Sequence, residues 1–151
     1  MQWRTMILAA TLAVATPAMA QQAQPGETAM SDDSERALVI VTSPSLQTQG
    51  MAMILANAMQ QQGSQLNILL CDAAGDLALE SHASEPLAPK GATPEGLMQK
   101  MMEEGAQVQV CAIYLPNSEY GEDDLREGVS VAAPGPIAEM MRDPKVPTFT
   151  F

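Results

Sequence analysis

The stretch ALVIVTSPSLQTQGMAMILANAMQQQG, residues 37–63, decides the fold class. It opens with five consecutive aliphatic residues at 37–41, a run that is typical of a strand covered on both faces. A Ser-Pro-Ser segment ends the run, and apolar residues then recur at three- and four-residue steps until Gly63, which stands where a left-handed residue ends a helix. The stretch therefore predicts a βα unit, with a strand at 37–41 and a helix at 46–62. The expected apolar face of this helix consists of Met51, Ile54, Leu55, Ala58 and Met59.

Two further units of the same kind follow. Residues 66–71 predict a second strand, and a short helical stretch and an irregular, proline-containing loop then lead up to residue 92. Thr93 is placed to cap a helix that ends at Gly105, because a proline follows it at the first helical position and an apolar face comes next. Residues 108–113 predict a third strand.

The last part of the chain has shorter elements. It predicts an acidic helix at 122–127, a strand at 128–131, a terminal helix at 136–142 and a closing strand at 146–149. Strands that alternate with helices in this way are typical of a parallel sheet. We therefore expect residues 37–151 to form one small α/β domain, a flavodoxin-like parallel sheet with helices on both faces.

The amino-terminal part of the chain carries targeting signals. Arg4, the apolar segment after it and the small-x-small sequence Ala-Met-Ala describe a signal peptide at residues 1–20, with an uncleaved anchor as the alternative. Residues 21–36 are polar and lack apolar periodicity, which predicts a flexible leader. The apolar run is too short to span a bilayer, and no later segment is long and apolar enough. We expect an exported, periplasmic protein, cleaved after Ala20 and not embedded in a membrane.

The composition excludes several classes of protein. A length of 151 residues leaves room for one compact domain, and a formal charge of −11 leaves no basic surface for nucleic-acid phosphates. One histidine and no GxSxG motif leave no Ser-His-Asp hydrolase, and no GxxxxGK[ST] or GxGxxG motif offers a phosphate-binding loop. We expect no nucleic-acid partner and no cofactor.

The candidate site lies at the carboxyl ends of the strands, where open parallel sheets bind their ligands. Two of the predicted strands each deliver a cysteine there, and Cys71 and Cys111 are the candidate catalytic residues because a thiolate is a nucleophile. The alternative for each is an inert, buried small side chain. The other candidate pocket residues lie at strand ends or in loops: Ser43, Pro44, Asp72, His82, Tyr114 and Asn117.

An ordered series of short segments runs through the domain. Its members are MAMILANAM at 51–59, Gly63, GATP at 91–94, GAQVQVC at 105–111, DL at 124–125 and GV at 128–129. By this series the chain resembles the DsrE/DsrF-like family of sulfur-relay proteins from residue 37 to residue 149. The resemblance implies a small α/β fold, assembly into trimers or hexamers, and a strand-end cysteine that carries persulfide sulfur, which is Cys111 here.

The predicted function is that of an exported sulfur carrier. Cys111 would accept sulfane sulfur from a donor and pass it to an acceptor thiol, with Cys71 as a second or resolving thiol. The donor and acceptor would be proteins or small thiols, and the carrier itself a homo-oligomer. A non-catalytic oligomeric binding or interaction module of the same fold is the alternative.

The two cysteines also raise the question of a disulfide. If both cysteine-bearing strands flank the first strand, their ends lie about two strand spacings apart, roughly 9.5 Å. That separation exceeds ordinary disulfide reach. We therefore expect two thiols, or a bond that forms only transiently.

A Cu(I) site is a further alternative, because cysteine and methionine sulfur are soft donors. The chain has 12 methionines but no CxxC or HxxxH spacing. Met98, Met101 and Met102 fall on the expected buried face of one helix, and Met140 and Met141 on that of another. A core rich in methionine therefore explains these residues better than a metal site does, and we predict none.

Overall fold

The computed structural model describes residues 35–151, so the predicted signal peptide and residues 21–34 of the predicted leader lie outside the described residues. The described strands form one parallel sheet in the order β4-β3-β2-β1-β5. Its strands are β1 (Arg36–Val41), β2 (Gln65–Leu70), β3 (Gln107–Val110), β4 (Ser130–Val131) and β5 (Thr148–Thr150). The helices are α1 (Leu46–Gln61), α2 (Pro94–Glu103) and α3 (Pro134–Arg142), with 3₁₀ helices η1 (Asp72–Ala78), η2 (Leu115–Asn117) and η3 (Glu122–Asp124). The predicted parallel α/β fold is confirmed. No helix within this part of the chain is both long and apolar enough to cross a bilayer.

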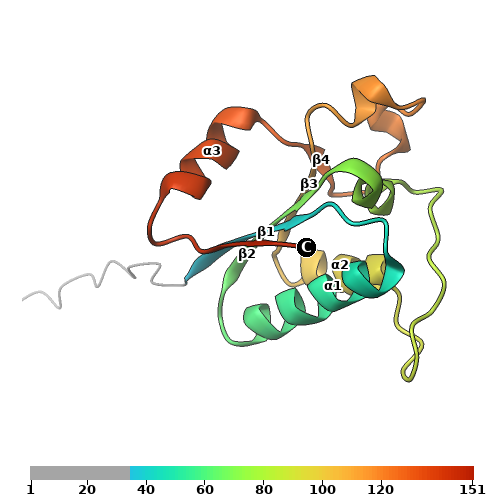
Figure 1. The fold of residues 1–151 in the computed structure, drawn as a ribbon, viewed down its shortest axis with the longest axis horizontal. Coiled ribbons are helices and arrows are strands. Elements are labelled where there is room, and N and C mark those ends of the chain that lie inside the picture. Colours follow the sequence, from blue (N-terminus) through green and yellow to red (C-terminus); the bar gives the residue numbers. More distant parts are fainter. Residues whose placement is uncertain (1–34) are drawn as a thin grey trace, which may run out of the picture. The chain divides into compact units, whose positions relative to one another are not determined.

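The order of the strands explains which helices cover which face of the sheet. From β1 to β3 each strand is added on the same side of its predecessor, so two right-handed crossovers place α1 and α2 on one face. The connection from β4 to β5 returns across the whole sheet, and its helix α3 lies on the opposite face. Figure 1 shows α1 and α2 on one side of the strands and α3 on the other.

The core is divided unequally between the two faces. Alternate residues of β1, β2 and β3, such as Val39, Ile68 and Val108, join α1, α2 and η1 in the main cluster. The α3 face holds a smaller cluster, which consists of Leu38, Leu69, Ala132, Ile137 and Val146. The helix α3 covers only part of that face. The sheet surface over β2 and β3 therefore remains partly uncovered.

The face of α1 that packs on the sheet differs from the predicted one. The buried residues are Gln49, Gly50, Ala52, Met53, Ala56 and Asn57. Met51, Ile54 and Leu55 were expected to lie inside, but they point away from the sheet and are 51%, 48% and 45% exposed. Small side chains let the helix approach its surroundings closely, and a Cβ on Gly50 would lie 2.1 Å from Leu87 Cδ1. The larger aliphatic side chains are therefore left on the outer surface.

The methionine-rich core is present, with one exception. Met53, Met98 and Met101 are fully buried in the main cluster. Met102 and Met140 are partly buried. Met141 was predicted to face the core, but it lies on the exposed side of α3. It follows Met140 directly, and adjacent residues of a helix point in different directions.

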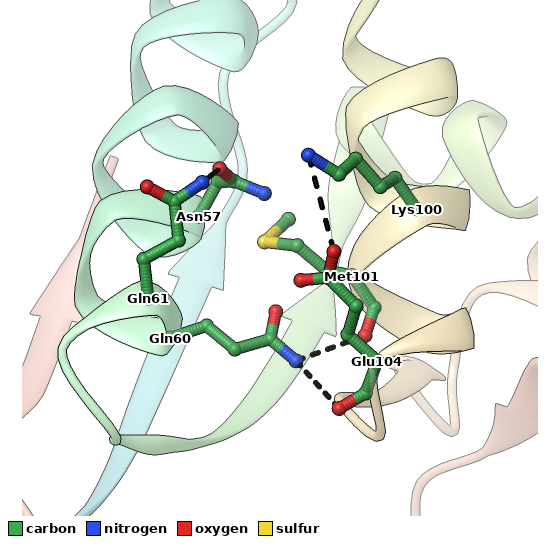
Figure 2. Close-up of polar contacts among 6 residues, drawn as sticks. All are labelled: Asn57, Gln60, Gln61, Lys100, Met101 and Glu104. Carbon is green, nitrogen blue, oxygen red and sulfur yellow. Dashed lines mark hydrogen bonds and ion pairs between the residues drawn. The ribbon is translucent and has the colours of Figure 1, made fainter.

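A polar clip joins the ends of α1 and α2 (Figure 2). Gln60 Nε2 donates hydrogen bonds to the carbonyl oxygens of Met101 and Glu104, at 3.0 and 3.1 Å. The Met101 carbonyl lies in the last turn of α2 and also accepts from the Ala106 amide at 2.9 Å, and Glu104 directly follows the helix. Lys100 Nζ lies 3.9 Å from Glu104 Oε1 on the same turn. Gln60 thus ties the end of α2 to its neighbour α1.

Replacing Gln60 tests this clip. Gln60→Ala should lower the free energy of unfolding by about 1 kcal/mol, because the Glu104 carbonyl loses its side-chain donor and the Met101 carbonyl keeps only the Ala106 amide. Gln47→Ala, at an exposed position of the same helix, should change it by less than about 0.5 kcal/mol. Urea denaturation measures both. Equal effects of the two substitutions would show that the clip contributes nothing to the free energy of unfolding.

Candidate functional site

Cys71 and Cys111 directly follow two neighbouring strands, β2 and β3. These strands pair with Leu70 opposite Val110. The ladder continues one residue further, because the Cys111 amide donates to the Leu70 carbonyl at 2.8 Å and the Cys71 amide to the Val41 carbonyl at 2.9 Å. The two cysteines are therefore neighbours across the sheet, with a Cα separation of about 4.8 Å from the strand spacing.

Both cysteine side chains lie on the α3 face. Side chains alternate along a strand, so Cys71 shares a face with Leu69, and Leu69 belongs to the smaller cluster under α3. Cys71 itself packs against that cluster. Cys111 shares its face with Gln109, which is opposite Leu69 in the β2–β3 register. Because register and face both agree, the two thiols come together.

The expected separation of two strand spacings is wrong. That expectation placed both cysteine-bearing strands beside the first strand, but β1 lies between β2 and β5, and β3 pairs with β2. One strand spacing, about 4.8 Å, falls within the Cα separations of about 4.4–6.8 Å that disulfides span. Both cysteines are free thiols and half-buried.

Thr42 and Ala132 extend the pair into a row across four strands, which we call the edge row. The register places Val41 opposite Leu70, and the next residue on each strand lies in the row. The Thr42 hydroxyl donates to the Phe151 carbonyl at 3.1 Å. Ala132 is buried in the smaller cluster, and its amide donates to the Val110 carbonyl at 2.8 Å. Thr42 was not predicted as a site residue, although it follows β1 as Cys71 follows β2.

The surroundings of Cys71 keep it protonated. Burial, a side-chain hydrogen bond with Cys111, and the negative charges of Cys111 and Asp72 raise the pKa of Cys71 to about 12. At neutral pH its S–H group is therefore a hydrogen-bond donor to Cys111.

Asp72, a predicted pocket residue, turns the chain directly after Cys71. Its backbone is left-handed, with φ of 50°, a conformation that Asp tolerates better than most residues. Its side chain is exposed, and its charge acts on Cys71. The turn starts η1 and leaves Cys71 at the tip of β2.

Tyr114, also predicted, joins the two loops that follow the cysteines. Its hydroxyl donates to Asp76 Oδ1 in η1 at 2.5 Å, and a Cβ on Gly75 would lie 2.3 Å from the ring. Burial and then the bond to Asp76 raise the pKa of Tyr114. The ring therefore packs directly on the turn after Cys71. Asp76 and Gly75 were missed as partners, although the glycine in the DAAGD turn is a signal of close approach.

The remaining predicted pocket residues make local contacts. Ser43 accepts from the Ser45 amide at 3.1 Å, Pro44 is exposed beside it, and Asn117 donates to the Ile113 carbonyl at 2.7 Å. His82 Nε2 lies 3.3 Å from Ser84 Oγ. These hydrogen bonds shape the loops and do not reach the cysteines. Among residues 35–151, no group of three or more His, Cys, Asp and Glu side chains could hold a metal ion.

A hollow of about 1110 Å³ lies over the uncovered part of the sheet, between β2, β3 and α3; we call it the α3 groove. Asn67 and Gln109 are among the residues that line it. The ion pair of Arg36 with Asp143, at 3.1 Å, lies where the groove meets the amino end of β1. Gln109 precedes Cys111 by two residues on the same face, a distance of about 6.6 Å along a strand. The lining of the groove on β3 therefore ends two residues before Cys111, and neither cysteine is part of it.

The start of α3 also lies near the edge row. Ala132 is opposite Cys111 in the continued register, and α3 begins at Pro134, two residues later. The first turn of α3 contains no acidic residue.

The fold and the paired thiols define a small parallel α/β protein with two cysteines at the carboxyl edge of its sheet. No protein-family model and no curated protein matches the sequence. Among solved structures, the crystal structure of the YchN protein from E. coli matches with a TM-score of 0.59 and 17% identity. The match covers 77% of this chain and 99% of that chain. The chain therefore shares the parallel α/β fold of YchN.

The raised pKa of Cys71 predicts slow alkylation of the reduced protein. At pH 8 its thiolate fraction lies far below that of an unfolded cysteine, so iodoacetamide should modify Cys71 at least about a hundredfold more slowly than in the denatured chain. The rate should rise about tenfold per pH unit from pH 8 to 11, because thiolate forms as the pH approaches the raised pKa. Peptide mass spectrometry measures the rate. Asp72→Asn should speed the reaction, and a rate equal to that of the denatured chain would contradict the assignment.

Proposed function

We propose that the protein is an exported sulfur carrier that accepts sulfane sulfur on Cys111 and passes it to a partner thiol. The observation that carries the proposal is the pair of neighbouring thiols at the ends of β2 and β3. The resemblance to DsrE/DsrF-like relay proteins points to the same residue, and the YchN-like fold is consistent with it.

Cys111 is the accepting thiol because the family resemblance assigns the persulfide to it and because Cys71 beside it is held protonated. The protonated Cys71 side chain hydrogen-bonds with it, and α3 begins nearby. The Cys111 thiolate attacks the outer sulfur of a donor persulfide, forms a new S–S bond and expels the donor thiolate. An acceptor thiolate then takes the outer sulfur and restores the Cys111 thiolate. No net oxidation or reduction occurs.

The α3 groove provides an approach to Cys111 for the donor and the acceptor. Its walls include the amide side chains of Asn67, Gln107 and Gln109, which can both donate and accept hydrogen bonds. Such a lining suits small thiols or a polar segment of a protein. We propose both classes as sulfur donors and acceptors.

Export is part of the proposal. The signal-peptide pattern of residues 1–20 supports it, and cleavage after Ala20 would release the protein into the periplasm. Donors and acceptors would then be periplasmic thiols or persulfides.

The carrier is further proposed to be a homo-oligomer, either a trimer or a hexamer. Met51, Ile54 and Leu55 form an exposed aliphatic stripe on the outer side of α1. Large aliphatic side chains gathered on one exposed helix face are typical of protein interfaces. The family resemblance supports the same assembly.

Sulfur loading tests the carrier proposal. The reduced protein treated with tetrasulfide should gain one sulfur atom on the peptide that contains Cys111, and Cys111→Ser should abolish this adduct. Cys71→Ser should still load, within about threefold of the wild-type rate, because a hydroxyl replaces the S–H donor. Unchanged loading of folded Cys111→Ser would refute the site. A wild-type protein that neither loads nor reacts would instead favour a non-catalytic binding module.

Charge on the stripe of α1 tests the assembly. Ile54→Glu should dissociate the oligomer to monomers, because burial of an unpaired carboxylate in an apolar interface costs several kcal/mol, on the order of 2–5. Gln47→Glu adds the same charge to an exposed position of α1 and should leave the assembly unchanged. Light scattering after gel filtration gives the masses. A monomeric wild-type protein would contradict the proposed assembly.

A further inference from the structure

Cys71 forms no bond to sulfur in the transfer from donor to acceptor, although it lies directly beside Cys111. The continued β2–β3 ladder and the shared face bring the two side chains together, and they hydrogen-bond with each other. A persulfide on Cys111 would therefore have its inner sulfur next to the sulfur of Cys71.

We infer that Cys71 resolves the Cys111 persulfide within one chain, so that the protein also reduces bound sulfane sulfur to hydrosulfide. The inference rests on the proposed function, since it requires a persulfide on Cys111. The carrier would then release its sulfur by a second route that requires no acceptor thiol.

The step balances within the pair of cysteines. Cys71 sulfur attacks Cys111 Sγ, the S–S bond of the persulfide breaks, and a Cys71–Cys111 disulfide forms. The outer sulfur leaves as hydrosulfide with the electron pair of the broken bond, and the proton of the Cys71 thiol goes to solvent or to the leaving sulfur. The two cysteine sulfurs are oxidised together as the outer sulfur is reduced. A dithiol reductant, by the usual thiol–disulfide exchange, restores the two thiols.

The geometry suits this bond. A Cα separation of about 4.8 Å between in-register neighbours lies inside the range that disulfides span. Each cysteine ends its strand and is followed by a turn, η1 after Cys71 and residues 112–114 after Cys111. Small adjustments at these ends do not disturb the rest of the ladder. Two groups held side by side also react far faster than the same groups free in solution.

The environment of Cys71 slows this release of hydrosulfide. The thiolate is the attacking species, and burial together with the charge of Asp72 disfavours it. An acceptor thiol that reaches Cys111 first therefore takes the sulfur. In the absence of an acceptor, the persulfide is discharged as hydrosulfide.

The test follows the fate of a loaded persulfide in matched variants. The reduced protein, Cys71→Ser, Cys71→Ala and Cys111→Ser are treated with one equivalent of tetrasulfide and freed of excess reagent. Intact mass then reports persulfide and disulfide, and a colorimetric assay reports hydrosulfide. Circular dichroism confirms that each variant is folded.

In the wild type the sulfur adduct should give way to a chain that has lost two hydrogens, with release of one hydrosulfide per chain. In Cys71→Ser and Cys71→Ala the adduct should persist at least about tenfold longer, since neither variant offers a second sulfur. Serine keeps the hydrogen-bond donor and alanine does not, so equal persistence in both assigns the effect to the attacking sulfur. Cys111→Ser should carry no adduct.

Equal lifetimes of the persulfide in wild type and Cys71→Ser, with no disulfide, would overturn the inference and leave the carrier proposal intact. No adduct in Cys71→Ser, together with no adduct and no disulfide in the wild type, would overturn the carrier proposal itself.

Discussion

The pairing of β2 with β3 is the constraint on which the site depends. Both strands are short, and their register places Leu70 opposite Val110. One further step along the ladder brings Cys71 and Cys111 together on the α3 face. A slip of one residue would send one of the two side chains to the other face and separate the thiols. The chemistry proposed for the pair therefore follows from the hydrogen bonds of the backbone.

The unequal faces of the sheet give each side a different use. The α1–α2 face carries the larger core, and α1 leaves Met51, Ile54 and Leu55 on its outer surface. The α3 face carries a thinner cluster and leaves a polar groove over β2 and β3. Both thiols lie on this thinner face. The larger core and the polar groove near the thiols thus lie on opposite faces of one sheet.

Local patterns in the sequence predicted most of the elements but not their arrangement. The aliphatic run at 37–41 and the cap formed by Thr93 are confirmed because strand composition and helix capping are local properties. The neighbourhood of Cys71 and Cys111 was not predictable, since pairing between distant strands leaves no trace in periodicity. The outward face of α1 was missed for a related reason: an aliphatic stripe has the same spacing whether it packs on a sheet or faces another chain. Tyr114 was predicted as a site residue, but its hydrogen-bond partner Asp76 was not.

The proximity of the two thiols is the central claim, and phenylarsine oxide tests it directly. The arsenic of this reagent bonds to two thiols at once only where they are neighbours. The reduced protein should bind one equivalent, and the adduct should protect both Cys71 and Cys111 from alkylation, as measured by intact and peptide mass. Alkylation of both cysteines at the rate of the untreated protein would show that they are apart, and would contradict the account.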